Sequence, residues 1–214
     1  MSRIRYPRTA HHPLSPGATS DDVRAGSMDA LAGREVVITA KLDGESFTGT
    51  REYCHARSLD SGYHPTRTRA IALWNGFRHE LPPPPFRVCC ENLQGRHSIA
   101  YAGLPSPLFV LNVWDEANVA LSWDDTEQWA ALLGLPTAPV LYRGPYDEAA
   151  FLRLTTVPPP WSDEAEGVVV RVTDPIPYDA WPTLAAKWVR TGHVQTGAEH
   201  WMHRSDVPEN TFAP

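Results

Sequence analysis

Short apolar runs rich in β-branched residues recur along the chain from residue 36 onward and predict a series of strands. The clearest run covers 166–172, where Glu-Gly precedes four valines interrupted by one arginine. Strongly apolar stretches at 86–91 and 107–115 predict two further strands. Weaker runs predict the remaining strands, at residues 36–39, 47–50, 53–57, 140–143 and 184–190.

Apolar residues at helical spacing predict a helix over 66–77. A second helix is expected over 123–133, because Ser122 is followed three residues later by an acidic residue, as in a capping box. Residues 147–154 predict a third helix. Strands and helices are mixed without the regular alternation of a doubly wound sheet. The expected fold class is therefore α+β with mostly antiparallel sheets.

The first twenty residues lack periodicity and contain three prolines, a composition typical of an extended arm. Arginines at positions 3, 5 and 8 either lie along a phosphate backbone or belong to a solvated tail. The 214 residues suit one large domain. We expect an N-terminal arm over 1–30, one domain over 31–204 and a C-terminal tail over 205–214.

Charge and composition exclude several classes of protein. A formal net charge of −6 argues against coating of nucleic acid, which depends on many lysine and arginine contacts to phosphate, although a local basic groove stays open. The chain has no apolar run of the ~20 residues that span a bilayer, and its first residues lack the apolar core of a signal peptide. We therefore expect a cytoplasmic protein without a membrane partner. Three cysteines, two of them adjacent, favour reduced thiols over a disulfide framework.

Lysine is scarce, since 17 of the 19 basic residues are arginine and lysine occurs only at positions 41 and 187. Arginine stays protonated at any accessible pH, whereas a lysine amine can lose its proton and attack. A codon bias toward arginine explains the scarcity but not the positions. Lys41 follows the β-branched run 36–39 and precedes an Asp-Gly turn, which places it at a strand end. Lys41 is therefore a candidate covalent nucleophile.

Six stretches, in chain order, resemble motifs of the covalent nucleotidyltransferase superfamily, and most closely those of ATP-dependent RNA ligases of the phage and editing-ligase type. They correspond to motifs I, Ia, III, IIIa, IV and V, at residues 41–45, 55–58, 91–93, 109–114, 166–171 and 186–190. Residues 96–101, 193–196 and 200–202 are similar to stretches of bacterial RNA ligase domains. One Lys-x-Asp-Gly motif is a weak signal, but six motifs in the right order are a specific one.

The resemblance implies an α+β nucleotidyltransferase domain of the ATP-grasp-like ligase adenylation type, with helices flanking the sheets. DNA ligases and capping enzymes add an OB-fold domain of ~70 to 100 residues. Only 27 residues follow Lys187, so we expect no OB-fold domain.

The resemblance also implies the reaction. Lys41 would attack the α-phosphorus of ATP, form lysyl-AMP and release pyrophosphate. The AMP would move to the 5′-phosphate of an RNA end, and the 3′-hydroxyl of a second end would displace it. The implied cofactors are ATP and Mg²⁺ or Mn²⁺, since a divalent metal offsets crowded phosphate oxygens. The implied partners are RNA ends.

Residue roles follow from the matched motifs. Glu166 would hold the metal, and Lys187 would contact the α-phosphate. Glu91 would accept a hydrogen bond from the ribose, and Arg57 would contact a phosphate or the RNA end. Metal and cationic neighbours would help Lys41 lose its proton.

The remaining expected nucleotide contacts are Ser46, Phe109, Leu111 and Arg190. Ser46 stands where DNA ligases and capping enzymes usually carry arginine and phage-type RNA ligases often carry asparagine, which favours an RNA ligase. Phe109 and Leu111 share one face of a regular strand, so either could cover the adenine. Arg190 ends the motif that contains Lys187.

Three alternatives remain beside the RNA ligase. The chain could adenylylate another acceptor, or form lysyl-AMP but need a partner protein that supplies end-healing or RNA-binding functions. A protein of another class would bind a nucleotide or an RNA end and have lost catalysis through Ala40, Leu111 and Val189. A zinc site built from histidines at 97, 193, 200 and 203 matches no standard spacing.

Overall fold

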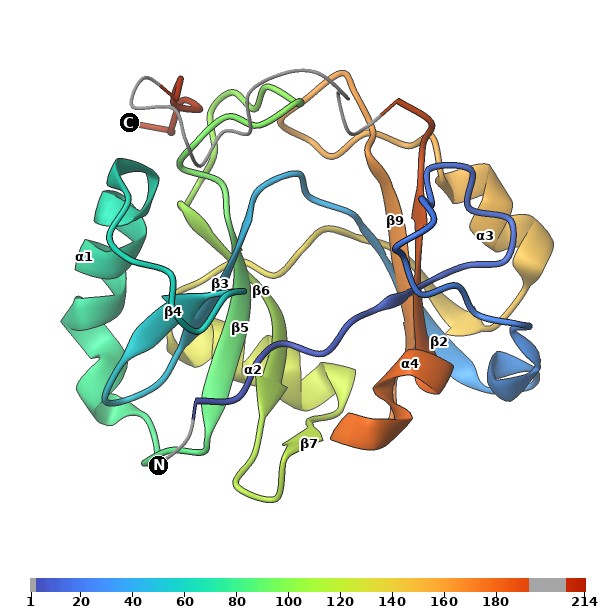
Figure 1. Ribbon diagram of the computed structural model, residues 1–214, viewed down its shortest axis with the longest axis horizontal. Coiled ribbons are helices and arrows are strands. Elements are labelled where there is room, and N and C mark those ends of the chain that lie inside the picture. Colours follow the sequence, from blue (N-terminus) through green and yellow to red (C-terminus); the bar gives the residue numbers. More distant parts are fainter. Residues whose placement is uncertain (1–2, 193–206) are drawn as a thin grey trace.

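Two β-sheets dominate the computed structural model, which describes residues 3–192 and 207–214 (Figure 1). The first sheet has five strands in the order β1–β11–β9–β2–β8, which span Ala10–His11, Ala185–Val189, Gly167–Val172, Glu35–Ala40 and Val140–Pro145. The second has six strands in the order β10–β7–β6–β5–β3–β4, which span Ile176–Pro177, Val119–Ala120, Leu108–Trp114, Arg87–Asn92, Glu45–Gly49 and Cys54–Ala56. Every pairing between these strands is antiparallel except that of β1 with β11.

Four α-helices lie around the sheets, α1 to α4, spanning Thr68–Phe77, Trp123–Leu132, Glu148–Leu154 and Trp181–Leu184 (Figure 1). Short 3₁₀ turns occur at Asp29–Leu31, Pro65–Arg67, Arg78–Glu80 and Tyr178–Ala180. Helix α2 begins as its sequence predicts, because the Ser122 hydroxyl accepts a hydrogen bond from the Asp125 N–H at 3.1 Å. None of the helices in the described part of the chain has both the length and the apolar character that crossing a membrane requires.

The predicted α+β class with mostly antiparallel sheets is confirmed, and no OB-fold domain occurs among the described residues. All eight predicted strands and all three predicted helices are present, with bounds within a few residues. The prediction missed β1, β7, β10 and α4, which have two to four residues each. Elements this short contain only about one period of the hydrophobic pattern, which is too little for the pattern to repeat, so tertiary contacts decide their conformation.

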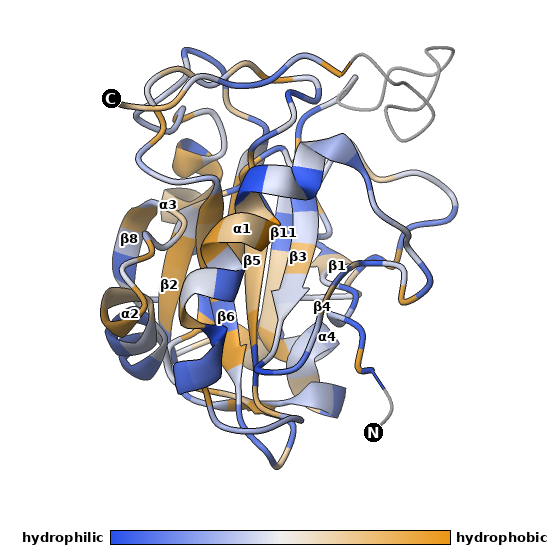
Figure 2. Ribbon diagram, turned by 90° about the vertical axis from the view of Figure 1, so that its left-hand side faces the viewer, coloured by the Kyte–Doolittle hydropathy of each residue, from blue (hydrophilic) through white to orange (hydrophobic). Residues whose placement is uncertain are grey.

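Alternation along the central strands separates a core face from a polar face. On β2 and β9, Val36, Ile38, Val168 and Val170 are fully buried in one apolar cluster. A second cluster joins β5 and β6 to residues of α1 and α2. Figure 2 shows β2 and β5 as largely hydrophobic ribbons inside more hydrophilic loops. The two clusters hold the sheets rigid, so that residues on the opposite strand face have fixed positions.

The chain crosses from the first sheet to the second through residues 41–44, between β2 and β3. Lys41 therefore lies at the junction of the two sheets. Gly44 is required in this crossover, because an added Cβ would lie 2.4 Å from the Asn92 carbonyl oxygen on β5. The predicted position of Lys41 at a strand end is confirmed.

The N-terminal segment, defined here as residues 3–24, runs in front of the sheets from the β4 side to β11 (Figure 1). Its residues 10–11 form β1, which adds to β11 in parallel through Ala10 with Ala186 and His11 with Lys187. Ala10 and His11 are almost fully buried. The segment is therefore part of the folded structure and not a solvated tail.

Candidate active site

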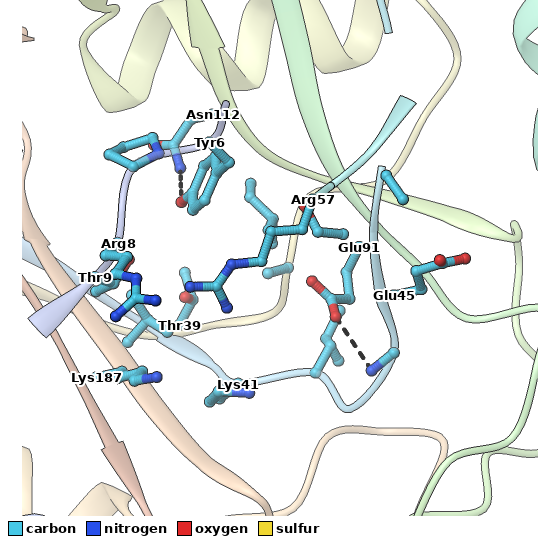
Figure 3. Close-up of a pocket in the computed structure, with 18 of the residues that line it drawn as sticks. Tyr6, Arg8, Thr9, Thr39, Lys41, Glu45, Arg57, Glu91, Asn112 and Lys187 are labelled. Atoms are coloured by element: carbon cyan, nitrogen blue, oxygen red, sulfur yellow. Dashed lines mark hydrogen bonds between the residues drawn. The ribbon is translucent and has the colours of Figure 1, made fainter. Parts of the chain in front are cut away.

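A cavity of about 660 Å³ opens between the two sheets, a volume typical of small-molecule sites. Residues from both sheets and from the N-terminal segment line it (Figure 3). On the first sheet, Thr39, Val169 and Lys187 are successive cross-strand partners, and all three line the cavity. Lys41 follows two residues after Thr39, at the bottom of the same space.

Lys41 forms an ion pair with Glu166, in which its Nζ donates a hydrogen bond to Oε1. The Lys41 side chain keeps 23% of its exposure whereas that of Glu166 has none, so the lysine and not the carboxylate lines the cavity. Burial opposes the charge of Lys41, but the negative charge of Glu166, its hydrogen bond with the amine and the negative charge of Asp43 outweigh it and raise the pKa of Lys41. The resemblance implies that a metal and cationic neighbours help Lys41 lose its proton. The carboxylates around it act in the opposite direction and favour the protonated form.

Gly167 allows Glu166 to reach this position. It begins β9 with a φ of +148°, and an added Cβ would lie 1.9 Å from the Trp188 carbonyl oxygen on β11. Only glycine lets the two strands approach so closely at this point. Glu166 thus supplies a buried carboxylate, and Gly167 begins β9 at a position where only glycine fits.

Lys187 lies on β11 with its side chain directed toward the cavity (Figure 3). Burial lowers the pKa of Lys187, and the positive charges of Lys41 and Arg57 lower it further. Asp22 of the N-terminal segment opposes this, because its Oδ1 lies 3.7 Å from the Lys187 Nζ and 3.4 Å from the His11 Nε2. The two lysines of the chain thus line one cavity.

Glu91 lies on β5 opposite Ser46 of β3, and both line the cavity. The Gly44 N–H donates a hydrogen bond to the Glu91 Oε1 at 3.2 Å. Burial raises the pKa of Glu91 to about 8; the positive charge of Lys41 opposes this rise, and the negative charges of Glu166 and Asp43 add to it. Near neutral pH this carboxyl is therefore largely protonated and can both donate and accept hydrogen bonds.

Asp43 faces away from the cavity and anchors the crossover. Its Oδ2 accepts hydrogen bonds from the Ser98 N–H at 2.8 Å, the Ser98 hydroxyl at 2.7 Å and the Ile99 N–H at 2.7 Å. Its own N–H donates to the Tyr101 hydroxyl at 2.8 Å. These bonds fix the chain just after Lys41 against residues 98–101. They give a structural reason for the Asp-Gly pair that follows Lys41.

Two of the predicted nucleotide contacts do not line the cavity. Phe109 is fully buried and packs on Trp161 with ring centroids 4.9 Å apart. Arg190 lies beyond the end of β11, where its guanidinium pairs with Glu164 at 3.1 Å. Ser46, Arg57 and Leu111 do line the cavity. Of the two residues expected to cover an adenine, Leu111 is therefore the one that faces the space.

A bulge in β6 explains the position of Leu111. Cys89 and Cys90 on β5 pair with Asn112 and Val110, which leaves Leu111 as an extra residue on β6. The irregularity turns both Leu111 and Asn112 toward the cavity, while Val110 stays in the apolar cluster of α1 and α2.

Sequence reasoning missed a polar chain on the cavity wall. The buried Arg171 guanidinium donates a hydrogen bond to the Asn112 Oδ1, and the Asn112 Nδ2 donates to the Tyr6 hydroxyl at 2.7 Å. Arg171 also donates to the carbonyls of Leu121 and Asp174 and lies over the Trp181 ring. A signal existed, because an arginine and an asparagine within otherwise apolar strands indicate a polar face.

Glu45 and Arg67, also missed, form a buried pair on the cavity wall. The Arg67 Nε donates to both carboxylate oxygens of Glu45, at 2.9 and 2.8 Å, and its Nη2 adds a third bond. The Arg67 Nη1 donates to the Gly62 carbonyl. The pair joins β3 to the turn before α1 and so holds the segment that follows Arg57.

No group of three or more histidine, cysteine or acidic side chains in the described ranges is placed to hold a metal ion. The histidines at 193, 200 and 203 lie outside those ranges, as do the stretches 193–196 and 200–202. Glu166 is a buried carboxylate beside the cavity, and Glu91 has a raised pKa partly because of its negative neighbours. A magnesium-type ion is usually held by one or two carboxylates and by ligand phosphates, and Glu166 is the carboxylate beside the cavity that would serve.

The family model described as RNA ligase matches residues 34–189, which contain most of this cavity. The chain belongs to the RNA ligase family. No match was found among curated proteins. The match leaves out the N-terminal segment, so the cavity wall that this segment forms is a feature outside the matched part of the RNA ligase domain.

Solved structures support the fold of this RNA ligase domain. The chain is similar to an RNA ligase of Naegleria gruberi with pyrophosphate, with a TM-score of 0.59 and 13% identity over 88% of this chain and 61% of that one. It is also similar to an archaeal ATP-dependent RNA ligase, with a TM-score of 0.55 and 15% identity over 87% of this chain and 48% of that one.

A third similar structure is a Naegleria gruberi RNA ligase mutant with ATP and Mn, with a TM-score of 0.54 and 12% identity over 89% of this chain and 61% of that one. The chain spans about half to three fifths of the length of these ligases. At such identities the likeness shows the nucleotidyltransferase fold alone.

Proposed function

We propose that the protein is an ATP-dependent RNA ligase that forms lysyl-AMP on Lys41. The observation that supports this best is the position of Lys41 in a chain of the RNA ligase family. Its side chain lines a nucleotide-sized cavity at the junction of the two sheets, pairs with Glu166 and shares the cavity with Lys187. Arginine could not replace it as a nucleophile, because a guanidinium keeps its proton.

The reaction proceeds in three transfers. The Lys41 Nζ loses a proton and attacks the α-phosphorus of ATP, so that an N–P bond forms and pyrophosphate leaves. An oxygen of an RNA 5′-phosphate then attacks the same phosphorus and releases Lys41, which gives an RNA capped by AMP. Finally the 3′-hydroxyl of a second RNA end attacks the 5′-phosphate, and AMP leaves. Positioning and charge neutralisation dominate such transfers.

The cavity residues divide these tasks. Lys187 and Arg57 offset negative charge on phosphate oxygens. Glu91, largely protonated near neutral pH, hydrogen-bonds the ribose, and Ser46 lies beside it on β3. Leu111 covers the base without an aromatic ring. Glu166 would hold a bound Mg²⁺ or Mn²⁺, which supplies positive charge for the phosphate oxygens.

Incubation with α-labelled ATP and Mg²⁺ or Mn²⁺ tests the nucleophile. We expect a covalent label that is absent from Lys41→Ala and from Lys41→Arg. Because the chain has only two lysines, digestion and mass spectrometry assign the AMP to position 41 or 187. AMP on Lys187 would contradict the assignment. The absence of label with every nucleotide and metal would leave a nucleotide- or RNA-end-binding protein.

A second experiment tests the acceptor. The adenylylated protein is mixed with 5′-phosphorylated RNA, with the 5′-hydroxyl form of the same strand, or with 5′-phosphorylated DNA. Transfer of label to 5′-phosphorylated RNA and joining of strands support the RNA ligase. Transfer without joining supports the need for a partner protein that supplies end-healing or RNA-binding functions. Label that stays on the protein with all three strands points to another acceptor.

A further inference from the structure

The N-terminal segment builds one wall of the cavity, although it lies outside the part of the chain that matches the family. Its residues 5–9 all line the cavity. In Figure 3, Arg8 points into the cavity toward the space that Arg57 and Lys187 also face. Arginines of this segment are therefore placed where the proposed reaction handles phosphate.

Several contacts hold this wall in place. The Tyr6 hydroxyl accepts a hydrogen bond from Asn112 at 2.7 Å, and the Tyr6 ring packs edge-on against Trp181 with centroids 5.9 Å apart. The Trp181 Nε1 donates to the Thr9 hydroxyl at 3.0 Å, and the Tyr178 hydroxyl donates to the Arg5 carbonyl at 3.1 Å. Residues 10–11 are paired to β11. The backbone on both sides of Arg8 is thus fixed to the domain.

The cations of the cavity differ in how their charge is balanced. Lys41, Arg67 and Lys187 each lie within ion-pair distance of a carboxylate, from Glu166, Glu45 and Asp22. Arg171 is buried and donates to Asn112 and to backbone carbonyls. Among the described residues, no carboxylate forms an ion pair with the other three, Arg5, Arg8 and Arg57.

Arg8 makes only a long hydrogen bond, 3.5 Å from its Nη1 to the Asp21 carbonyl oxygen, and its side chain is exposed. Its guanidinium points into a cavity that also contains the positive charges of Arg57 and Lys187 (Figure 3). Like charges in one space repel each other unless an anion lies between them. A guanidinium can donate two parallel hydrogen bonds to the oxygens of a phosphate group, which a lysine ammonium cannot match in geometry.

We propose that Arg8 binds a phosphate group at the mouth of the Lys41 cavity, opposite Arg57. This inference rests on the proposed function for the identity of the ligand. The phosphate belongs either to the leaving pyrophosphate part of ATP or to the 5′ end of the RNA. Both sources offer the same oxyanion chemistry, and the two reaction steps separate them.

The test compares Arg8→Gln, which removes the charge, with Arg8→Lys, which keeps it without the fork. Arg3→Gln is the matched control, because Arg3 belongs to the same segment but lies outside the cavity, over the Tyr53 ring at 5.3 Å. Thermal unfolding shows whether each variant folds. Lysyl-AMP formation is followed against ATP concentration, and AMP transfer from preformed lysyl-AMP is followed against the concentration of 5′-phosphorylated RNA.

We expect Arg8→Gln to raise one of the two half-saturating concentrations about tenfold, with partial recovery in Arg8→Lys and little change in Arg3→Gln. A change in the ATP step identifies the nucleotide phosphates as the ligand, and a change in the RNA step identifies the 5′-phosphate. If both half-saturating concentrations stay within about twofold of the wild type, the proposal is overturned.

Binding of inorganic pyrophosphate, measured by calorimetry, tests Arg8 without any reaction. We expect the dissociation constant of pyrophosphate to rise about tenfold in Arg8→Gln and to stay near the wild-type value in Arg3→Gln. If the wild-type protein forms no lysyl-AMP but binds pyrophosphate through Arg8, the proposed function fails and the phosphate site stands. If the wild type and Arg8→Gln bind pyrophosphate with equal affinity and have the same two half-saturating concentrations, the phosphate site at Arg8 is rejected. The proposed function is then unaffected.

Discussion

Lys41 and Glu166, 125 residues apart in the chain, form an ion pair that joins the end of β2 to the start of β9. The Lys41 amine pairs with the carboxylate of Glu166, whose side chain has no exposure to solvent. The nucleophile of the proposed reaction is therefore held as a cation until its surroundings change. Burial alone would lower the pKa of Lys41, and the neighbouring carboxylates raise it.

Glu166→Gln is expected to lower the pKa of Lys41 in metal-free buffer, because the amide removes a negative charge that favours the ammonium form. Competitive acetylation at mildly alkaline pH, read by mass spectrometry, measures the reactivity of each lysine. Lys41 should become more reactive in the variant. Lys187 should change less, since Glu166 is the weakest of the main influences on it. Unchanged reactivity of Lys41 would mean that the ion pair does not control its proton.

Glu91 predicts a pH dependence of stability. Its pKa is raised from an ordinary 4.5 to about 8, so between these values the folded protein keeps a proton that the unfolded chain has lost. The free energy of unfolding therefore falls as pH rises through this range. Glu91→Gln should flatten the fall, so that the variant gains stability relative to wild type more at pH 8 than at pH 5.

Urea unfolding of both proteins at several pH values in this interval measures the effect. Glu116→Gln is a suitable control, because Glu116 is exposed and lies outside the cavity. A wild-type protein whose stability does not fall with pH, or a Glu91→Gln variant that keeps the full slope, would contradict the raised pKa of Glu91.

The fold was largely predictable because the hydrophobic pattern repeats along its longer strands and helices. The valine run of β9 and the serine cap of α2 are examples. β1 was not predictable, because Ala10 and His11 have no apolar pattern and become a strand only through pairing with β11. The sequence singled out the arginines at positions 3, 5 and 8 but could not show that residues 5–9 form part of the cavity wall.

The site was predictable where rare residues marked it. Lys41 and Lys187 stood out by composition, and the structure places both in one cavity. Phe109 and Leu111 could not be separated from sequence, because a regular strand puts both on one face and the β6 bulge cannot be read from the pattern. Arg190 follows β11 directly, and its pairing with Glu164 depends on the loop before β9.

Asp43→Ala is expected to destabilise the protein by about 2–4 kcal/mol, because it leaves the N–H groups of Ser98 and Ile99 without their carboxylate acceptor. Asp43→Asn keeps one oxygen acceptor, so its free energy of unfolding should fall less. Asp60→Ala, in an exposed loop, is the control. The measurement is urea unfolding, and a loss in Asp43→Ala no greater than in Asp60→Ala would show that these bonds contribute little.

We expect the contributions of Glu45 and Arg67 to stability to be strongly coupled, because the two buried charges pair with each other. Both side chains have less than a tenth of their exposure, and three hydrogen bonds join them. Replacing either one alone, as in Glu45→Gln or Arg67→Met, leaves a buried charge without its partner and should lower the free energy of unfolding by about 3–5 kcal/mol. The double variant removes both charges and should lose clearly less than the sum of the two single losses.

Urea unfolding of the wild type, the two single variants and the double variant completes the cycle. The Arg67 bond to the Gly62 carbonyl is lost in Arg67→Met but not in Glu45→Gln, so the arginine variant should be the less stable of the two. If the losses of the two single variants add up to that of the double variant, Glu45 and Arg67 stabilise the protein through other neighbours and not through each other. The pair fixes the segment after Arg57. A coupled loss of stability would therefore indicate that the Glu45–Arg67 contact helps to position Arg57.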